Sequence, residues 1–391
     1  MPSSRLPRDR TLNATTRALE SLRARGIDVI DLTVSNPTRV GLHYPDDLFS
    51  SLASPRALDY DPHPLGLATA RQAVADDFAR RGLKVPPDRI ALTASTSEAY
   101  AWLFKLLCDP GDRVLVPRPS YPLFEHLTLL ESIESPAYSL EYHGSWRIDI
   151  AEVRRLIDAR VRALLVVSPN NPTGSFVHRD DLRALDEVCA EHDVMLIGDE
   201  VFADFAFDPG AAVSVLETSE AVVCSLGGLS KTVGLPQVKL GWIGFGGPDA
   251  NVADVMAAFE LIADTYLSVS TPVQVALPDL LREGTHVRAQ IVQRVAANLR
   301  FLQEAVARTP AVTLLPVEAG WSAVLRVPSY QSEESLVLQL LTDEHVFVHP
   351  GFFFDFDRES FLVVSLLTPP KPFAAGIARV LERVSNPRSA S

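Results

Sequence analysis

Short apolar segments that alternate with helical segments between residues 89 and 245 constrain the fold more than any other feature. They are RIALTA (89–94), RVLVP (113–117), RALLVVS (162–168), VMLIGD (194–199), AVVCSL (221–226) and LGWIGF (240–245). Runs rich in β-branched residues, separated by helical patterns such as that at 179–192, predict a mostly parallel sheet covered by helices on both faces. Ligands of such sheets bind at the carboxyl ends of the strands.

The chain has 391 residues, which is more than one hydrophobic core usually holds, so we expect a second, smaller domain. A helical segment at 9–25 and a short strand at 29–34 begin the chain. After a long helical stretch at 282–308, strand and helix patterns follow at 322–327, 332–343, 346–348, 361–367 and 372–385. We therefore predict an α/β fold with a large domain at 46–281 and a smaller α+β domain made of 1–45 plus 282–391.

Composition excludes several classes of protein. A formal net charge of −13 without a basic cluster argues against a nucleic-acid partner. No apolar run is long enough to cross a bilayer, and the N-terminal residues lack a signal-peptide core, so we expect a cytoplasmic protein. Cys108, Cys189 and Cys224 lie in apolar stretches without metal-ligand spacing, and they predict reduced cysteines and no metal site.

Polar motifs follow three of the predicted strands. They are SPNNPTG (168–174), DEVF (199–202) and SLGGLSK (225–231). The carboxyl ends of parallel strands meet at one edge of a sheet, so we expect these groups to lie together. Lys231 has a long cationic side chain and is surrounded in sequence by glycines and small residues. Glycines let the backbone approach a ligand closely, so this stretch indicates a lysine that contacts a planar, phosphorylated molecule.

These motifs resemble a known family of enzymes. NNPTG, then D-E-x-F, then S-K-x-x-G-L-P-x-x-K-x-G-W, in this order and spacing, resemble the fold-type I pyridoxal-phosphate (PLP) enzymes of the class I/II aminotransferase family. YDPHPLG (60–66) and PSYP (119–122) extend the resemblance over nearly the whole chain. It implies a seven-stranded type of sheet between helices, pyridoxal 5′-phosphate as cofactor, and transfer of an amino group from an amino acid to a 2-oxo acid.

The resemblance also implies roles at the cofactor ring. Lys231 forms the Schiff base, for which its amine must be neutral, and then acts as general base. Asp199 keeps the ring nitrogen protonated, Asn171 hydrogen-bonds the ring oxygen O3′ beside the substrate, and Tyr121 stacks on the ring. Structural alternatives remain open, because Asp199 and Asn171 could each stabilise a turn and Tyr121 could be a core aromatic.

The phosphate requires a cluster of hydrogen-bond donors. Free backbone N–H groups at the junction of a strand and a helix favour an anion, and hydroxyls add donors there: Ser95, Thr96 and Ser97. A helix N-cap is the structural alternative for this junction. Lys239 stands where the family has an arginine, and Ser230 adds a hydroxyl.

Two residues imply an assembly. Tyr60 resembles the tyrosine that reaches the phosphate of a neighbouring subunit, and Thr271 reaches across in the same way. The resemblance therefore implies a homodimer with shared active sites.

The chain departs from the family pattern at the cofactor. Ser95 replaces a glycine, and Gly228 replaces a serine. Lys239 replaces the arginine that binds the phosphate, so a planar guanidinium with several donors becomes a single ammonium charge. Phe202 replaces a tyrosine whose hydroxyl bonds O3′, so we predict a higher Schiff-base pKa than in tyrosine-bearing relatives.

The departure at the substrate is larger. FLVVSLL (361–367) puts Val363 where the family has the arginine that binds the substrate α-carboxylate. Losing such a contact costs on the order of 1.5–3 kcal/mol unless another group replaces it. Arg39, which could equally be a surface charge, is our candidate replacement, and Arg326 is a weaker one. Tyr266 stands near the position of an arginine in dicarboxylate-specific relatives, which disfavours aspartate as donor.

Other functions share the same cofactor. Val363 keeps a β-lyase, a decarboxylase or a racemase open as alternatives to an aminotransferase. A non-catalytic PLP-binding module is less favoured, because the segment before the sheet is too short for a DNA-binding domain. Within HPGFFFDFDRES (349–360), the aromatic residues 352–354 either fill the core or line a pocket for an apolar substrate side chain.

Overall fold

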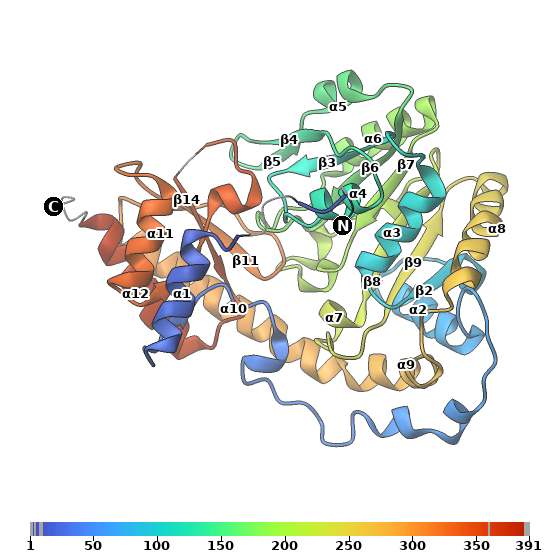
Figure 1. Cartoon of the computed structure of the whole chain (residues 1–391), viewed down its shortest axis with the longest axis horizontal. Coiled ribbons are helices and arrows are strands. Elements are labelled where there is room, and N and C mark those ends of the chain that lie inside the picture. Colours follow the sequence, from blue (N-terminus) through green and yellow to red (C-terminus); the bar gives the residue numbers. More distant parts are fainter. Residues whose placement is uncertain (1–2, 4, 8–10, 359, 387–391) are drawn as a thin grey trace.

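A central sheet of eight strands organises the chain (Figure 1). The computed structural model describes residues 3, 5–7, 11–358 and 360–386, so the start of the predicted helix at 9–25 lies outside the described residues. In spatial order the strands are β2 (Ile90–Thr93), β9 (Gly241–Gly246), β8 (Val223–Gly228), β7 (Met195–Asp199), β6 (Val161–Val167), β3 (Arg113–Arg118), β4 (Ala137–Tyr142) and β5 (Trp146–Ile148). The mostly parallel α/β sheet predicted from the sequence is confirmed.

Parallel pairing joins β8, β7, β6, β3 and β4, whereas β9 is antiparallel to both of its neighbours and β5 is antiparallel to β4. The sheet thus has one strand more than the seven-stranded type, because the short hairpin strand β5 extends its edge. β4 and β5 were absent from the predicted strands. Buried and less buried residues are mixed along both strands, and several positions are polar, so they lack the continuous apolar run that marked the others.

Both faces of the sheet are buried. In β6, Leu164 and Val166 join one hydrophobic cluster, while Ala163, Leu165 and Val167 join another on the opposite face. Successive side chains of a strand point to opposite faces, so a run without polar residues requires cover on each.

Helices provide that cover in two layers. One face packs against α3 (Thr96–Leu107), α4 (Phe124–Leu130) and α8 (Asp249–Tyr266). The other packs against α2 (Ala68–Arg80), α5 (Ile150–Leu156), α6 (Arg179–His192) and α9 (Thr271–Glu283). The short helix α7 (Leu229–Thr232) follows β8 at the edge of the sheet.

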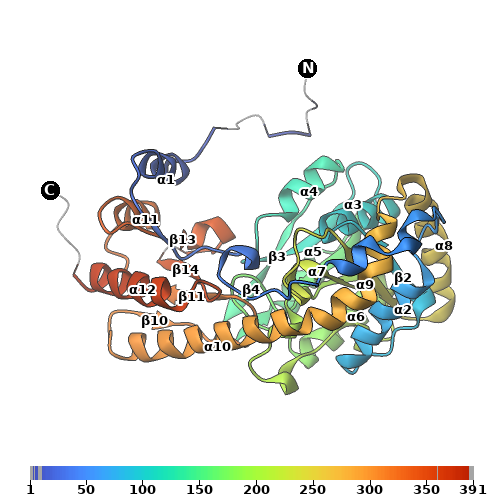
Figure 2. The same ribbon diagram turned by 90° about the horizontal axis from the view of Figure 1, so that it is seen from below.

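A second, antiparallel sheet lies beside the first (Figure 1). Its order is β10 (Thr313–Leu314), β11 (Ser322–Arg326), β14 (Phe361–Ser365) and β13 (His349–Pro350). The helices α1 (Ala14–Ala24), α11 (Glu333–Thr342) and α12 (Pro370–Ser385) belong to this region, and α10 (Thr285–Ala307) spans both regions (Figure 2).

The N-terminal segment joins the C-terminal region. β1 (Ile30–Asp31) pairs in parallel with β12 (Val346–Phe347), and the backbone N–H of Ser365 donates to the carbonyl of Leu32 at 2.6 Å. The segment around β1 thus contacts the C-terminal region, and the domain bounds 46–281 and 1–45 plus 282–391 stay a prediction. Thr33 and Ser35, which follow β1, line a cavity together with Asp199 at the end of β7.

Among the described residues, no helix combines the length and the apolar character that crossing a membrane requires.

Candidate active site

The carboxyl ends of three neighbouring strands coincide. Val167 at the end of β6 lies beside Asp199 at the end of β7, and Asp199 lies beside Leu226 in β8. A cavity of about 320 Å³ is located at this edge. Its lining includes six residues predicted from the sequence: Thr96, Tyr121, Asn171, Asp199, Phe202 and Lys231.

Lys231 lies in α7, directly after β8, and its side chain is enclosed. Burial lowers the pKa of its amine to about 8, although the carboxylate of Asp199 acts in the opposite direction. Nζ lies 4.9 Å from the ring centroid of Trp321 and 5.3 Å from that of Phe202. Loss of hydration disfavours the charged amine, so its neutral fraction near neutral pH is larger than that of a solvated lysine.

Asp199 is held by two hydrogen bonds. The hydroxyl of Tyr100 donates to Oδ2 at 2.8 Å, and the backbone N–H of Val201 donates to Oδ1 at 3.3 Å. Burial raises the pKa of this carboxyl, and the bond from Tyr100 counteracts that rise. The hydrogen bond from Val201 agrees with the alternative in which Asp199 stabilises the turn after β7. Asp199 can therefore stabilise this turn and bind a ligand at the same time. Tyr100 was missed from the sequence, although it lies one helical turn after Thr96 and so on the same face of α3.

Asn171 meets the second sheet. The hydroxyl of Ser322 in β11 donates to its Oδ1 at 3.2 Å, which leaves the amide nitrogen available as a donor toward the cavity. Ser322 comes from a segment 151 residues away in the chain, so no local pattern could have indicated it.

The second sheet forms the opposite wall. His349 in β13 is the cross-strand partner of Val363 in β14, and both line the cavity. The imidazole stacks on Phe353 with centroids 4.7 Å apart and planes 3° apart. Burial lowers the pKa of His349 to about 4, with Asp31 acting against that change.

The three phenylalanines of the 349–360 segment have different positions. Phe353 and Phe354 line the cavity, and Phe354 is also buried in the core. Phe352 is 49% exposed. Phe353 and Phe354 therefore fit the alternative in which the aromatic residues line a pocket. Phe354 also fits the alternative in which they fill the core, and Phe352 fits neither.

The predicted substitutes for the missing arginine lie elsewhere. The N-terminal segment reaches the cavity through Thr33 and Ser35, whereas Arg39 is exposed at the end of the 3₁₀ turn Pro37–Arg39 and is absent from the cavity lining. Arg326 is exposed at the far end of β11 and lines a different cavity. A carboxylate contact for Arg39 stays a prediction.

At the expected phosphate position, the structure brings only part of the predicted set to the cavity. Thr96 lines it, while Ser95 accepts a hydrogen bond from the backbone N–H of Glu98 and so caps α3. Ser97, Ser230 and Lys239 are absent from the lining. Lys239 is exposed. The segment that contains Lys239 nevertheless passes close to the N-terminus of α3, because a Cβ added to Gly241 would lie 3.1 Å from the backbone nitrogen of Thr96.

The two residues predicted to cross between subunits lie together. Tyr60 and Thr271 line one small pocket that is separate from the Lys231 cavity, and Tyr60 is 77% exposed. Tyr266 stacks on Trp102 and does not line the Lys231 cavity.

The cavity fits the expected cofactor. Its volume lies in the range of small-molecule sites. Ser120 and Trp321 line it, and the Oγ of one and the Nε1 of the other are buried without a hydrogen-bond partner among the described residues. Buried polar atoms are normally satisfied, so these two await a ligand with polar groups. A weakly basic amine, a buried carboxylate and an amide donor complete a set that suits pyridoxal phosphate.

Comparison with known proteins gives an independent result. The model of the family "Aminotransferase class I and II" matches residues 29–371. The alanine aminotransferase of Mycobacterium tuberculosis is 27% identical over 380 residues, with 93% of this chain and 86% of the relative covered. The glutamate-pyruvate aminotransferase AlaA of Escherichia coli is also 27% identical, over 66% of this chain and 65% of the relative.

Solved structures agree in fold. An alanine aminotransferase from Pyrococcus furiosus superposes with a TM-score of 0.89 at 23% identity, covering 98% of this chain and 99% of the other. An aspartate aminotransferase from Thermotoga maritima gives 0.83 at 21% identity, covering 98% and 100%. The family match over most of the chain, the fold and the lysine-centred cavity lead to one conclusion: this chain belongs to the class I and II aminotransferase family, and it is a pyridoxal-phosphate-dependent aminotransferase.

Proposed function

We propose that the chain transfers the amino group of a small neutral amino acid, alanine being the reference substrate, to a 2-oxo acid, with Lys231 as the residue that carries the cofactor. The observation behind this choice is the apolar wall formed by Phe353, Phe354 and Val363. Lys231 is the only lysine or arginine among the described residues that line the cavity, so a distal substrate carboxylate finds no arginine there. The names of the alanine and glutamate-pyruvate relatives point the same way.

Each cavity residue has a defined task in this proposal. When bound, the cofactor supplies an electron sink that stabilises negative charge at the substrate Cα. The amine of Lys231, with its pKa lowered to about 8, takes the α-proton and returns it as general acid. Asp199 holds the proton at the ring nitrogen, and Tyr100 keeps that carboxylate oriented.

Other residues hold the ring and the phosphate. Asn171 donates to the ring oxygen, and Tyr121 covers one ring face. The N-terminus of α3 at Thr96 takes the phosphate, assisted by Ser95, Ser97, Ser230 and Lys239. Phe202 supplies no hydroxyl at the ring oxygen.

For the substrate α-carboxylate, His349 is a second candidate beside Arg39. It lies across the strand pair from Val363, where the family arginine would be, and a ring N–H can donate to a carboxylate. Arg39 is exposed and does not line the cavity, whereas His349 does.

We also propose a homodimer in the cytoplasm. Tyr60 and Thr271 lie at one pocket, and the neighbouring Leu58 is 87% exposed, so a large apolar side chain lies at the surface beside the residues expected to cross. In such a dimer, Lys231 of one subunit and Tyr60 of the other serve the same site. Mixing inactive Lys231→Ala subunits with Tyr60→Ala subunits would then restore activity, because one site of each mixed dimer keeps both residues. No gain on mixing would exclude shared sites.

The decisive experiment is a single-turnover reaction of the loaded enzyme with alanine, aspartate and glutamate, followed by the visible absorbance. We expect conversion to the pyridoxamine form, fastest with alanine. Release of ammonia, hydrogen sulfide and pyruvate from added cysteine, whose thiol can leave from Cβ, without an acceptor would instead identify a β-lyase. Faster conversion with aspartate would refute the neutral substrate. Arg39→Ala is measured alongside, and an unchanged KM for alanine would remove Arg39 from the site.

A further inference from the structure

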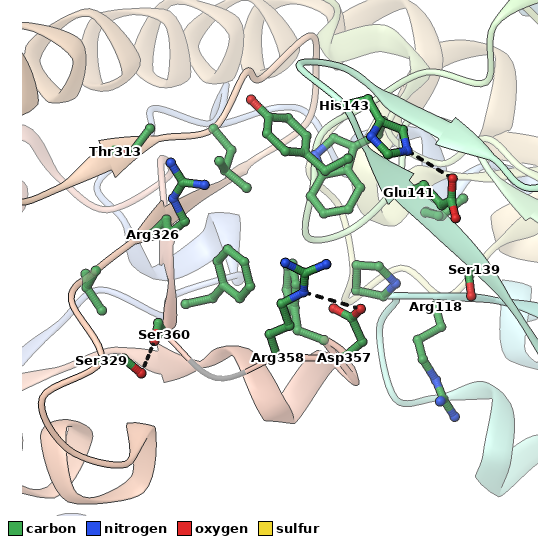
Figure 3. Close-up of a pocket in the computed structure, with 18 of the residues that line it drawn as sticks. Arg118, Ser139, Glu141, His143, Thr313, Arg326, Ser329, Asp357, Arg358 and Ser360 are labelled. Atoms are coloured by element: carbon green, nitrogen blue, oxygen red, sulfur yellow. Dashed lines mark hydrogen bonds and ion pairs between the residues drawn. The ribbon is translucent and has the colours of Figure 1, made fainter.

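A second cavity, of about 640 Å³, lies where the two sheets meet (Figure 3). The central sheet contributes the end of β3, β4 and β5, and the second sheet contributes β10, β11 and the segment before β14. This cavity shares no lining residue with the Lys231 cavity. It is therefore a separate space, and a ligand bound there would contact both regions of the molecule.

Aromatic rings form much of its wall. Tyr142 and Trp146 from the central sheet have centroids 5.2 Å apart, and Trp146 lies 6.0 Å from Phe356. Phe356 in turn lies 4.6 Å from Phe361 of β14. A continuous row of rings thus crosses from one region to the other and offers an apolar surface to a planar ligand.

Trp146 carries an unused donor. It is 7% exposed, and its Nε1 has no hydrogen-bond partner among the described residues. Buried indole N–H groups usually find an acceptor, so this wall is incomplete in hydrogen bonding.

The charges of the cavity favour an anion. Among the described residues, the lining has three arginines and two carboxylates, in a chain whose net charge is −13. Both carboxylates already have partners, because Glu141 lies 3.0 Å from His143 and Asp357 lies 3.8 Å from Arg358.

Two arginines of this lining, Arg326 and Arg118, have no ion pair among the described residues, and Arg326 is the one directed into the cavity. Within the described part of the chain the guanidinium of Arg326 makes neither a hydrogen bond nor an ion pair. Figure 3 shows Arg326 and Arg358 directed toward the middle of the cavity, whereas Arg118 extends away from it. An unpaired guanidinium beside aromatic rings is suited to a carboxylate carried on a planar apolar body.

We propose that this cavity binds an aryl carboxylate, with the carboxylate on Arg326 and the ring system against Phe356 and Phe361. Arg326 was a weak candidate for the substrate α-carboxylate. It stands four residues along β11 from Ser322, which lines the Lys231 cavity, and four strand residues span about 13 Å. The carboxylate that Arg326 binds is therefore that of a second ligand.

The test is a calorimetric titration of the PLP-loaded protein with 2-naphthoate. This probe has neither an amino nor an oxo group, so it cannot be transaminated, and the measurement does not depend on turnover. We expect one site per chain, and Arg326→Gln should weaken binding roughly tenfold or more, as loss of a charge-assisted bond does. Arg118→Gln is the matched control, because that arginine borders the same cavity but points away, and its affinity should stay within about threefold.

Three outcomes would overturn the proposal. The first is the absence of binding to the unaltered protein. The second is an equal loss in both arginine variants, which would indicate general attraction of anions. The third is displacement of the probe by saturating alanine, together with a change of the visible band when the probe alone is added, which would place the probe in the Lys231 cavity. Both arginines are exposed, so neither substitution threatens the fold.

Discussion

The two walls of the Lys231 cavity differ in chemistry. The wall from the central sheet carries a lysine, an aspartate and an asparagine at successive strand ends, and burial shifts the pKa values of the lysine and the aspartate. The wall from the second sheet carries Val363, Phe353 and one uncharged imidazole. The groups proposed for cofactor chemistry and those proposed for substrate recognition therefore lie on separate walls, so in this proposal recognition can change while the chemistry is kept.

The largest effect should come from the central wall. Lys231→Ala removes both the covalent anchor and the proton carrier, so we expect kcat to fall by roughly 10⁴ or more. Borohydride treatment followed by peptide mapping should find the cofactor adduct on the peptide with Lys231 in the unaltered enzyme and no adduct there in the variant. An adduct on another lysine would assign the chemistry elsewhere.

The same lysine should weaken the fold of the cofactor-free protein. Its pKa is about 10.5 in the unfolded chain and about 8 in the folded one, so between these values the unfolded state binds more protons and stability rises with pH. Below pH 8 the burial of the charged amine lowers the free energy of unfolding by its full amount, which is at most about 3 kcal/mol. We expect apo Lys231→Met to be more stable than the unaltered apoprotein near pH 7, and denaturant titrations should show the difference vanishing toward pH 10.5.

A flat difference between pH 7 and pH 10.5 would mean that the lysine is as well solvated in the folded protein as in the unfolded chain.

On the opposite wall, the effect should be on binding. His349→Ala should raise the KM for alanine roughly tenfold with a smaller change of kcat, because a hydrogen bond to a charged group is lost. His349→Gln keeps a donor and should recover part of the loss. If both variants lower kcat and leave KM unchanged, the imidazole serves packing against Phe353 and not the carboxylate.

The smallest effect concerns Phe202. Phe202→Tyr restores a hydroxyl at the ring oxygen, and a bond to the deprotonated form should lower the pKa of the visible absorption band by about one unit. A spectrophotometric pH titration measures it. An unshifted or raised value would show that the tyrosine hydroxyl does not reach the ring.

The sequence predicted the central wall well, because its residues follow continuous apolar strands in local motifs. Lys231, Asp199 and Asn171 lie within a few residues of strand ends, and parallel pairing brings such ends together. The opposite wall was predicted poorly. His349 faces Val363 through antiparallel register, and Ser322 reaches Asn171 from another sheet. These contacts depend on how two sheets meet, which no local periodicity encodes.

Propensity also failed for the weakest strands. β5 has three residues, and β10 and β13 have two each, so their existence depends on a neighbour rather than on a pattern. The predicted phosphate set shows a related limit, because the Ser95 side chain is used to cap α3.

The position of Trp321 gives the protein an optical reporter of its own state. Its ring stands 4.9 Å from Nζ of Lys231, so a chromophore attached to that amine would accept the excitation of the indole almost completely. Emission at tryptophan wavelengths should therefore dim when cofactor is added to the empty protein. Loading could then be followed in real time without any attached dye.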